Sequence, residues 1–396
     1  MANYVERQLK KDFEALAEAV PAVAVVGPRQ AGKTTFLKHE QAGKNTSYAV
    51  FDDPDARTLF ETDVKKFEAQ YVEGFERTVL DEVQYCKNAG QNIKYLADKG
   101  HKLWITASSE TLLAASVLSH LVGRVSILRL YPFSLPEFLD AKAQKESTPE
   151  MLSRAVWEHA TYGGYPRVCL EQGIETKKTM LRDLAETMIL KDMAQVFSIQ
   201  ETTALQLFSK HAAASAGTLF SSESASRDLR LSYQTIRKYS DAMEKSYLIR
   251  FAPPFFSNKS KELVKQPKLF FVDCGLRNAI ANSFAPELDG RIFENYVYSE
   301  LLKAGHSPKY WRTKAGAEVD FVVEQGNAPF PVEAKLTAEP GRISRSLRSF
   351  INAYKPKAAA VVSYKPVAAQ QKFGGCTITY CDPLSMHAAI NARAGQ

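Results

Sequence analysis

The first third of the chain alternates short apolar runs with stretches rich in helix-forming residues. The apolar runs lie at residues 23–26, 48–51, 79–80, 102–107 and 125–130. Buried strands that alternate with helices are typical of a parallel β-sheet with helices on its faces. We therefore expect an α/β fold over residues 1–141. A polar stretch at residues 142–150 follows, and its composition is typical of a linker.

A glycine-rich motif follows the first apolar run directly. Its letters, GPRQAGKT at residues 27–34, match the pattern GxxxxGK[ST], and Thr35 can open a helix. In this pattern backbone N–H groups surround phosphate oxygens, Lys33 reaches the β- and γ-phosphates, and the Thr34 hydroxyl coordinates Mg²⁺. The sequence therefore predicts binding of ATP and Mg²⁺ by a loop made of Gly27, Pro28, Arg29, Gln30, Ala31, Gly32, Lys33, Thr34 and Thr35.

Two acidic residues, Asp81 and Glu82, directly follow the apolar run at residues 79–80. Asp81 is placed to hold Mg²⁺ at a strand end, and Glu82 to polarise the water that attacks ATP. The alternative is an ordinary strand end with solvated acids. An extra strand separates the strand before the glycine-rich loop from the strand that ends in Asp81. That order, with a glutamate next to the aspartate, points to an AAA-type ATPase rather than a kinase or a GTPase.

Two further residues are candidates for contact with the γ-phosphate of ATP. Ser108 ends the apolar run 102–107, where such ATPases place a polar sensor of this phosphate; a serine that caps a loop is the alternative. Arg124 is the nearest basic candidate, and it can stabilise transition-state charge in its own subunit or in a neighbouring one. A solvent-exposed arginine without this role is the alternative.

The middle of the chain is predicted to be helical and then to form a winged helix. Residues 142–220 are rich in helix formers with apolar positions three and four residues apart. Residues 221–268 predict a helix, a turn with Ser232 as N-cap, a second helix and a strand. In such a unit the second helix lies in the DNA major groove. Its exposed polar residues are Gln234, Arg237 and Lys238. A winged helix that only packs domains together is the alternative.

The last third combines acids and a lysine on two strands. A hairpin is predicted within residues 317–335, and alternate residues of a strand face the same side, so Glu333 and Lys335 point into one site. The hairpin brings Asp320 beside Glu333, and Glu294, on a preceding helix, is a third acid. Such a group can hold Mg²⁺ and orient water for phosphodiester hydrolysis. The alternatives are a surface hairpin with solvated charges and a nuclease fold used only for binding.

The order of these motifs resembles a bacterial and archaeal family that joins an AAA-type ATPase domain to a C-terminal domain of unknown function with a restriction-endonuclease-like, PD-(D/E)xK core. The motifs that carry the resemblance are GPRQAGKTT (27–35), LDEVQ (80–84), GR (123–124), YPFSLPEFL (131–139), GGYP (163–166), PKLFFVDCGL (267–276), RIFENYVYSELL (291–302), EVDFVV (318–323) and VEAK (332–335). One departure is Ala107-Ser108, where the family pattern usually has Thr-Gly-Ser. The resemblance implies that the C-terminal α/β domain, residues 287–396, is restriction-endonuclease-like.

Composition and charge bear on three further questions, namely membrane contact, cellular location and nucleic-acid binding. The chain has 396 residues and no run of about 18 apolar residues, so we expect no membrane-spanning helix and no membrane partner. Five scattered cysteines and a charged start predict a protein of the cytoplasm. The net charge is +7, and residues 221–268 carry 10 basic against 5 acidic side chains. This excess favours contact with nucleic-acid phosphates, and a solvated positive face accounts for it equally well.

Together, these observations favour Mg²⁺-dependent ATP binding and hydrolysis coupled to DNA binding or processing, with nuclease activity at the C-terminal acids as an open question. One alternative is an ATP-driven switch that regulates protein partners and carries a silent nuclease-like domain. Another is a DNA-binding regulator with slow ATPase activity. A homo-oligomer is compatible with each of these functions.

Overall fold

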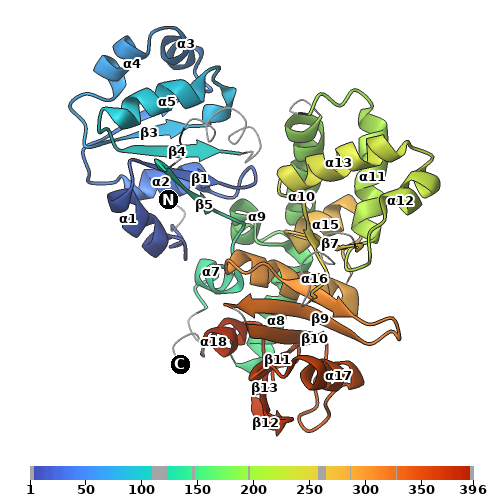
Figure 1. Ribbon diagram of the computed structural model, residues 1–396. Coiled ribbons are helices and arrows are strands. Elements are labelled where there is room, and N and C mark those ends of the chain that lie inside the picture. The colour runs from blue at the N-terminus through green and yellow to red at the C-terminus, as the bar shows by residue number, and fades with distance from the viewer. Residues whose placement is uncertain are drawn as a thin grey trace. The chain divides into compact units, whose positions relative to one another are not determined.

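The chain folds into two compact units, which we describe separately in the computed structural model (Figure 1). The first comprises residues 1–132 and 245–247, and the second comprises residues 133–244 and 248–396. The structure describes residues 4–108, 121, 123–144, 148–194, 197–256, 265–285, 287–326 and 328–392. Within these ranges, no helix is both long enough and apolar enough to cross a lipid bilayer.

The first unit alternates strands and helices from its start. Its elements are α1 (Lys10–Ala19), β1 (Ala22–Val26), α2 (Lys33–Glu40), β2 (Thr46–Val50), α3 (Pro54–Thr62), α4 (Val64–Tyr71), β3 (Arg77–Asp81), a 3₁₀ turn (Val83–Tyr85), α5 (Ala89–Asp98), β4 (Leu103–Ala107) and β5 (Val125–Arg129). Each apolar run of the sequence overlaps one of these strands. The expected α/β fold is therefore confirmed for this unit.

The sheet of the first unit has the strand order β2-β3-β4-β1-β5, and all of its pairings are parallel. The strand that separates β1 from β3 in space is β4, whereas β2 lies at the sheet edge. Phe13 of α1 packs on Phe36 of α2 and on Trp104 of β4 in one apolar cluster, so these two helices cover one face. Figure 1 shows α3, α4 and α5 on the other face. Because all strands run the same way, their carboxyl ends share one edge.

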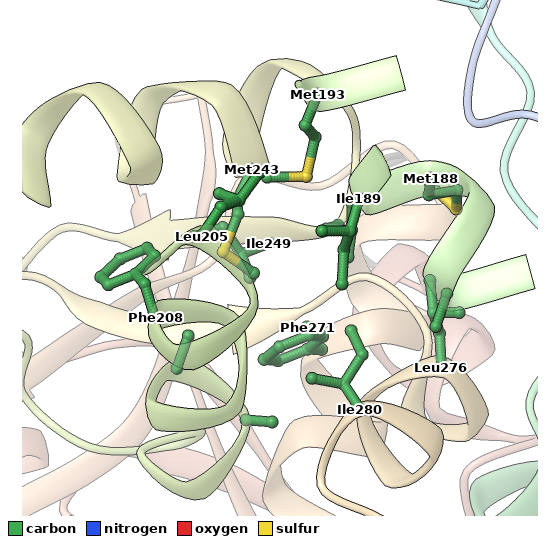
Figure 2. Packing of buried hydrophobic residues seen from close by; sticks show 14 of the residues in the cluster. Met188, Ile189, Met193, Leu205, Phe208, Met243, Ile249, Phe271, Leu276 and Ile280 are labelled. Atoms are coloured by element: carbon green, nitrogen blue, oxygen red, sulfur yellow. The ribbon is translucent and has the colours of Figure 1, made fainter. Parts of the chain in front are cut away.

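The second unit begins with helices and ends with a mixed sheet. Its first elements are α7 (Leu135–Ala141), α8 (Pro149–Tyr162), α9 (Pro166–Leu170), α10 (Ile174–Thr187), a π-helical segment (Met188–Met193), α11 (Thr202–Ala214), α12 (Ser222–Leu229), α13 (Tyr233–Lys245), β6 (Ile249–Ala252), β7 (Lys268–Phe271) and α15 (Cys274–Ile280). Figure 2 shows the apolar core that they share, with Met188, Phe208, Met243, Phe271 and Ile280 packed together. Methionine side chains suit this irregular junction because they are flexible.

The elements α12, α13, β6 and β7 occupy the segment expected to be a winged helix. The Ser232 hydroxyl accepts the N–H of Thr235 at 3.0 Å and so caps α13, as the sequence predicts. The strands β6 and β7 pair in antiparallel fashion. The expected polar residues of α13, Gln234, Arg237 and Lys238, are exposed, as is Asp241. The winged-helix assignment and its role in DNA binding stay predictions.

The remainder of the second unit is a six-stranded sheet with helices. Its elements are α16 (Gly290–Lys303), β8 (Lys309–Arg312), β9 (Glu318–Gln325), β10 (Ala328–Lys335), α17 (Arg345–Tyr354), β11 (Ala358–Ser363), β12 (Ala369–Phe373), β13 (Cys376–Cys381) and α18 (Met386–Asn391). The strand order is β12-β13-β11-β10-β9-β8. β9 pairs with β8 and β10 in antiparallel fashion, and β10 pairs with β11 in parallel. Figure 1 shows α16 and α17 on opposite faces of β9 and β10.

Two glycines of the second unit lie where the backbone packs too closely for a side chain. A Cβ atom on Gly164 would meet the Phe133 carbonyl oxygen at 2.2 Å, and one on Gly275 would meet the Tyr162 backbone at 2.2 Å. The N–H of Phe133 donates to the Gly164 carbonyl at 2.7 Å. The GGYP motif at residues 163–166 is thus a point of close backbone packing between α8, α15 and the segment that starts at Phe133.

Candidate functional site

The glycine-rich loop lies between the end of β1 and the start of α2. Gly27 has a φ of 153°, and a Cβ there would meet the Leu130 carbonyl oxygen at 2.1 Å. The buried Lys33 ammonium donates to the carbonyl oxygens of Gly27 and Pro28, both at 3.0 Å. The lysine side chain is therefore folded back over its own loop, at the positively polarised start of α2, where an anion is stabilised.

The middle of this loop takes a tight course. Gln30 and Gly32 have positive φ values of 61° and 99°, so the chain turns sharply before α2. The guanidinium of the buried Arg7 donates to the Ala31 carbonyl at 2.9 Å and to the Tyr131 carbonyl at 2.5 Å. Arg7 thus fixes the loop against the segment that follows β5. The sequence patterns did not identify Arg7, because it lies 20 residues before the motif.

Asp81 lies at the carboxyl end of β3 and accepts hydrogen bonds from three hydroxyl groups. The Thr34 hydroxyl lies 3.1 and 3.2 Å from the two carboxylate oxygens of Asp81, so the two expected magnesium ligands are in contact. The other donors are Tyr48 of β2 and Thr106 of β4. Burial, together with the Asp81 carboxylate, raises the pKa of Tyr48, so its hydroxyl stays protonated and donates. Tyr48 and Thr106 are site residues that the sequence patterns did not identify.

Glu82 follows Asp81 in a left-handed conformation with a φ of 62°. Its backbone N–H donates to the Thr106 hydroxyl oxygen at 2.8 Å. The Gln84 amide nitrogen contacts the Glu82 carboxylate and also lies 3.0 Å from the Ser108 hydroxyl. One amide group therefore connects the expected water-polarising acid with the expected phosphate sensor. Gln84 belongs to the LDEVQ motif at residues 80–84, but the motif predicts no role for it.

Arg124 lies at the opposite edge of the sheet from the glycine-rich loop. In the parallel pairing of β1 with β5, Ala22 is opposite Val125 and Val26 is opposite Arg129. Arg124 precedes Val125 and pairs with Asp98 at 2.5 Å. A strand of this length spans about 13 Å. The expectation that Arg124 contacts ATP bound to its own subunit is therefore wrong. Contact with ATP bound to another copy stays a prediction.

The expected C-terminal residues converge. The Lys335 ammonium lies 3.7 Å from the carboxylates of both Asp320 and Glu333. The backbone N–H of Ala334 donates to Asp320 at 2.8 Å, and the Ser344 hydroxyl donates to Glu333 at 2.5 Å. Antiparallel pairing of β9 with β10 produces this arrangement, because it brings the strand that carries Asp320 alongside the strand that carries Glu333.

Glu294 completes a second group of acids around Asp320. Carboxylate oxygens of Glu294, Glu318 and Asp320 all lie within 4.8 Å of one another. The Lys268 ammonium lies 2.8 Å from Glu294 and also contacts Glu318. Lys268 and Glu318 were not predicted as site residues. Glu318 could have been found by its alternation with Asp320 on one strand, whereas no local pattern marks Lys268.

Burial changes the protonation of this acidic cluster. Burial raises the pKa of Glu294 to about 7, against the opposing effect of the Lys268 charge. Burial also raises the pKa of Glu333 above its usual range. For Lys335, burial favours the neutral amine, but the carboxylates of Asp320 and Glu333 outweigh it and raise the pKa. Carboxylate oxygens held this closely are ligands that suit Mg²⁺ or Mn²⁺.

Family models match three successive segments of the chain. Residues 19–139 match a model described as an AAA domain. Residues 153–287 and 289–381 match two models described as domains of unknown function, DUF8612 and DUF4143. The acidic cluster apart from Lys268 lies in the third segment.

Several relatives are similar over most of the chain. An uncharacterised protein of Mycobacterium tuberculosis is 27% identical over 345 residues, covering 83% of this chain and 73% of the relative. An uncharacterised protein of Methanocaldococcus jannaschii is 26% identical over 324 residues, covering 76% of this chain and 71% of the relative. An uncharacterised protein of Haemophilus influenzae is 28% identical and covers 63% of each chain.

Two solved structures resemble parts of the fold. A Walker-type ATPase of Pyrococcus abyssi has a TM-score of 0.49 and 12% identity, covering 70% of this chain and 96% of that chain. The ORC2 protein of Aeropyrum pernix has a TM-score of 0.41 and 12% identity, covering 77% of this chain and 98% of that chain. The AAA domain match identifies an AAA-type ATPase domain at residues 19–139, and it supports ATP binding and hydrolysis.

Proposed function

We propose that this protein couples Mg²⁺-dependent ATP hydrolysis in its first unit to DNA binding and metal-assisted phosphodiester cleavage in its second unit. One observation carries most of the proposal. The chain has an AAA-type ATPase domain, and its second unit also brings Asp320 and Glu333 within 3.7 Å of the Lys335 ammonium. Two acids and a lysine in this arrangement fit the hydrolysis of a phosphodiester.

The contacts around the glycine-rich loop fit ATP and Mg²⁺. Asp81 and the Thr34 hydroxyl provide adjacent oxygen atoms of the kind that bind Mg²⁺. The Lys33 ammonium can exchange its two loop carbonyls for β- and γ-phosphate oxygens. Bound Mg²⁺ would neutralise phosphate charge. Glu82 would orient the attacking water and accept its proton, and the Gln84 amide would hold the Glu82 carboxylate in place.

The C-terminal acids fit a divalent cation for the same chemical reason. Asp320 and Glu333 would hold it through carboxylate oxygens, and Glu294 lies next to Asp320. A bound cation would polarise the phosphodiester. Lys335, whose side chain is 42% exposed, can reach both the acids and an incoming substrate. The sequence of elements α16, β8, β9, β10, α17 and β11 supports a restriction-endonuclease-like domain.

DNA is the proposed substrate because the exposed face of α13 carries the required groups. Gln234, Arg237 and Lys238 are all exposed on it. The surrounding residues, 221–268, carry 10 basic against 5 acidic side chains. Lysine and arginine bind phosphates with release of counterions, so this binding should weaken steeply as salt increases.

ATP hydrolysis measured with and without DNA tests the coupling. We expect duplex or single-stranded DNA to raise the hydrolysis rate of the wild-type chain. Replacement of Arg237 and Lys238 by alanine should remove this stimulation and leave the rate without DNA unchanged. The matched control replaces Arg154 and Lys210, which are exposed residues of α8 and α11. Equal rates with and without DNA in the wild type would contradict the coupling.

DNA cleavage is tested separately on a panel of DNA forms with Mn²⁺ or Mg²⁺. We expect cleavage by the wild type and none by Lys335→Met. The absence of cleavage from wild type across the panel would remove the nuclease activity and leave the ATPase in place.

A second candidate function is an ATP-driven switch that acts on protein partners through a silent nuclease-like domain. One observation favours it: the Lys268 ammonium lies among the acids and neutralises part of the charge that a metal ion would need. ATP-dependent co-purification of a protein partner, together with normal binding by Lys335→Met, would support this candidate over the first.

A further inference from the structure

A buried lysine lies inside the acidic cluster of the second unit. The Lys268 side chain is 4% exposed, and its ammonium lies 2.8 Å from Glu294 and in contact with Glu318. The ammonium also lies 5.8 Å from the centre of the Tyr310 ring. A lysine is seldom buried without a paired charge, so these two carboxylates account for its place in the fold.

The carboxylates that surround Lys268 belong to the group that could receive a metal ion. Glu294 and Glu318 share their 4.8 Å grouping with Asp320. A carboxylate oxygen that contacts an ammonium at 2.8 Å cannot at the same time bind Mg²⁺ at about 2.0–2.1 Å from the same direction. Repulsion between the two cations adds to this steric conflict. Lys268 and a divalent ion therefore compete for the same oxygens.

The four carboxylates of the cluster outnumber the three cations in contact with them. Among Glu294, Glu318, Asp320 and Glu333 there are four carboxylates, and Lys268 and Lys335 are the two lysines in contact with them. The exposed Arg312 guanidinium lies 3.6 Å from Glu318. Asp320 and Glu333, which Lys268 does not touch in any described contact, remain the pair available to an ion.

Lys268 comes from outside the sheet that carries the acids. It is the first residue of β7, and it pairs with Ala252 of β6 in the two-stranded sheet that follows α13. A bridge to Leu219, ahead of α12, holds the same residue from its other side. The backbone of Lys268 is therefore fixed to the helical module that contains α12 and α13, the proposed DNA-binding elements.

We propose that Lys268 occupies a cation position formed by Glu294 and Glu318 beside Asp320, and thereby closes this position to a divalent ion. This proposal rests on the metal site of the proposed function. It leaves Asp320 and Glu333 as the part of that site that is open to an ion. It ties the number of ions that the acidic cluster accepts to the position of the paired strands β6 and β7. A site that opens fully would need the lysine to withdraw.

Counting bound Mn²⁺ tests this inference on the full chain without nucleotide. Equilibrium dialysis with electron paramagnetic resonance gives the number of ions for wild type, Lys268→Met and Lys309→Met. Lys309→Met is the matched control, because Lys309 also pairs with a glutamate, Glu324 at 2.6 Å, on the same sheet. We expect Lys268→Met to bind one Mn²⁺ more than wild type, and Lys309→Met to bind the wild-type number. An unchanged number in Lys268→Met overturns the inference.

Thermal unfolding gives an independent readout of the same competition. Without its lysine the cluster should be destabilised by repulsion between acids, and Mn²⁺ should restore it. We therefore expect Mn²⁺ to raise the Tm of Lys268→Met by several degrees more than it raises that of Lys309→Met. Equal increases would contradict the inference.

Amine labelling of the wild-type chain keeps the inference testable if Lys268→Met does not fold. Acetylation followed by mass spectrometry reports which lysines are accessible. We expect Lys268 to stay unlabelled at Mn²⁺ concentrations that saturate the wild type. Labelling of Lys268 that rises in step with Mn²⁺ binding would show that the ion displaces it readily, which overturns the closure. DNA cleavage is measured separately, so its absence would end the proposed nuclease function without affecting the ion count.

Discussion

The Thr106 hydroxyl oxygen accepts the backbone N–H of Glu82 at 2.8 Å, and the same hydroxyl group donates its hydrogen to the Asp81 carboxylate. One side chain of β4 thus fixes both acids at the end of β3. The left-handed backbone of Glu82 depends on this bond, because that conformation is unfavourable for a residue with a side chain.

Replacement of Thr106 by valine should lower the ATP hydrolysis rate while ATP still binds. Valine keeps the shape and removes the hydroxyl, so the Glu82 N–H loses its partner at a cost of about 1–3 kcal/mol. The expected result is a lower kcat and a small change in KM. The matched control is Thr78→Val, because Thr78 is a buried threonine of β3 whose hydroxyl contacts only the Tyr71 carbonyl among its described partners. Equal kcat values for the two variants would contradict the assigned role.

Lys33→Ala should lose nucleotide binding, because the loop would lose its ammonium group. Nucleotide binding can be measured with a fluorescent ATP analogue. Lys66→Ala, which changes an exposed lysine of α4, is the control and should bind as the wild type does. Binding of wild-type strength by Lys33→Ala would show that this lysine does not reach the phosphates.

Glu82→Gln should bind ATP but hydrolyse it about 10²–10⁴-fold more slowly, the usual contribution of a positioned general base. Single-turnover hydrolysis separates this effect from product release. A hydrolysis rate equal to that of wild type would remove Glu82 from the proposed mechanism.

Asp320→Asn and Lys335→Met should separate metal binding from cleavage. Asparagine can still accept the Ala334 N–H through its side-chain oxygen, so the strand pairing should survive while the Mn²⁺ affinity falls. Lys335→Met removes a positive charge 3.7 Å from both acids, so Mn²⁺ should bind at least as tightly while cleavage is lost. Calorimetry and a DNA cleavage assay provide the two measurements. Weaker Mn²⁺ binding by Lys335→Met would contradict the assignment.

A buried histidine makes stability depend on pH. The neutral form of His159 fits both of its neighbours, because Nε2–H can donate to the Phe133 carbonyl at 3.0 Å while Nδ1 accepts from the Tyr296 hydroxyl at 3.1 Å. Burial, reinforced by the charge of Lys303, lowers the pKa of His159 to about 3. In the unfolded chain this pKa is about 6.5. Below pH 6.5 the His159 side chain therefore binds a proton in the unfolded state, whereas it stays neutral in the folded state down to about pH 3.

The free energy of unfolding should accordingly fall as the pH decreases from about 6.5 towards 3. Above pH 6.5 His159 should contribute no pH dependence. His159→Gln can keep one donor and one acceptor but does not titrate, so its stability should fall less over the same range. Urea unfolding between pH 5 and 8 measures this difference. Parallel curves for the two proteins would mean that other groups govern the decline.

Local patterns predict the strands and the loop of the first unit well. β1 ends directly before the glycine-rich motif, α2 begins at Lys33 within it, and β3 ends at Asp81, because chain-local apolar runs and turn residues determine these boundaries. The position of Arg124 was also available from the sequence. A residue that precedes a parallel strand lies at the edge opposite the loops that follow the strands.

Contacts between distant segments explain what the sequence did not reveal. Tyr48 reaches Asp81 because β2 pairs with β3, and Thr106 does so because Leu80 pairs with Ile105. Such pairings depend on the register of whole strands, which no local motif specifies. Lys268 is 26 positions before Glu294 and 50 before Glu318, in a segment whose pattern indicates only a buried strand.

The close packing at Gly164 and Gly275 has an evolutionary consequence. Even the smallest side chain at either position would overlap backbone atoms at 2.2 Å, so descendants of this chain that keep the fold have no substitute for these glycines. The acids and lysines of the cluster are under no such constraint, since each can be exchanged without a backbone clash. Descendants that lose the activity of the second unit should therefore lose those charged residues and still keep Gly164 and Gly275. The two glycines therefore report on the fold and are silent about activity.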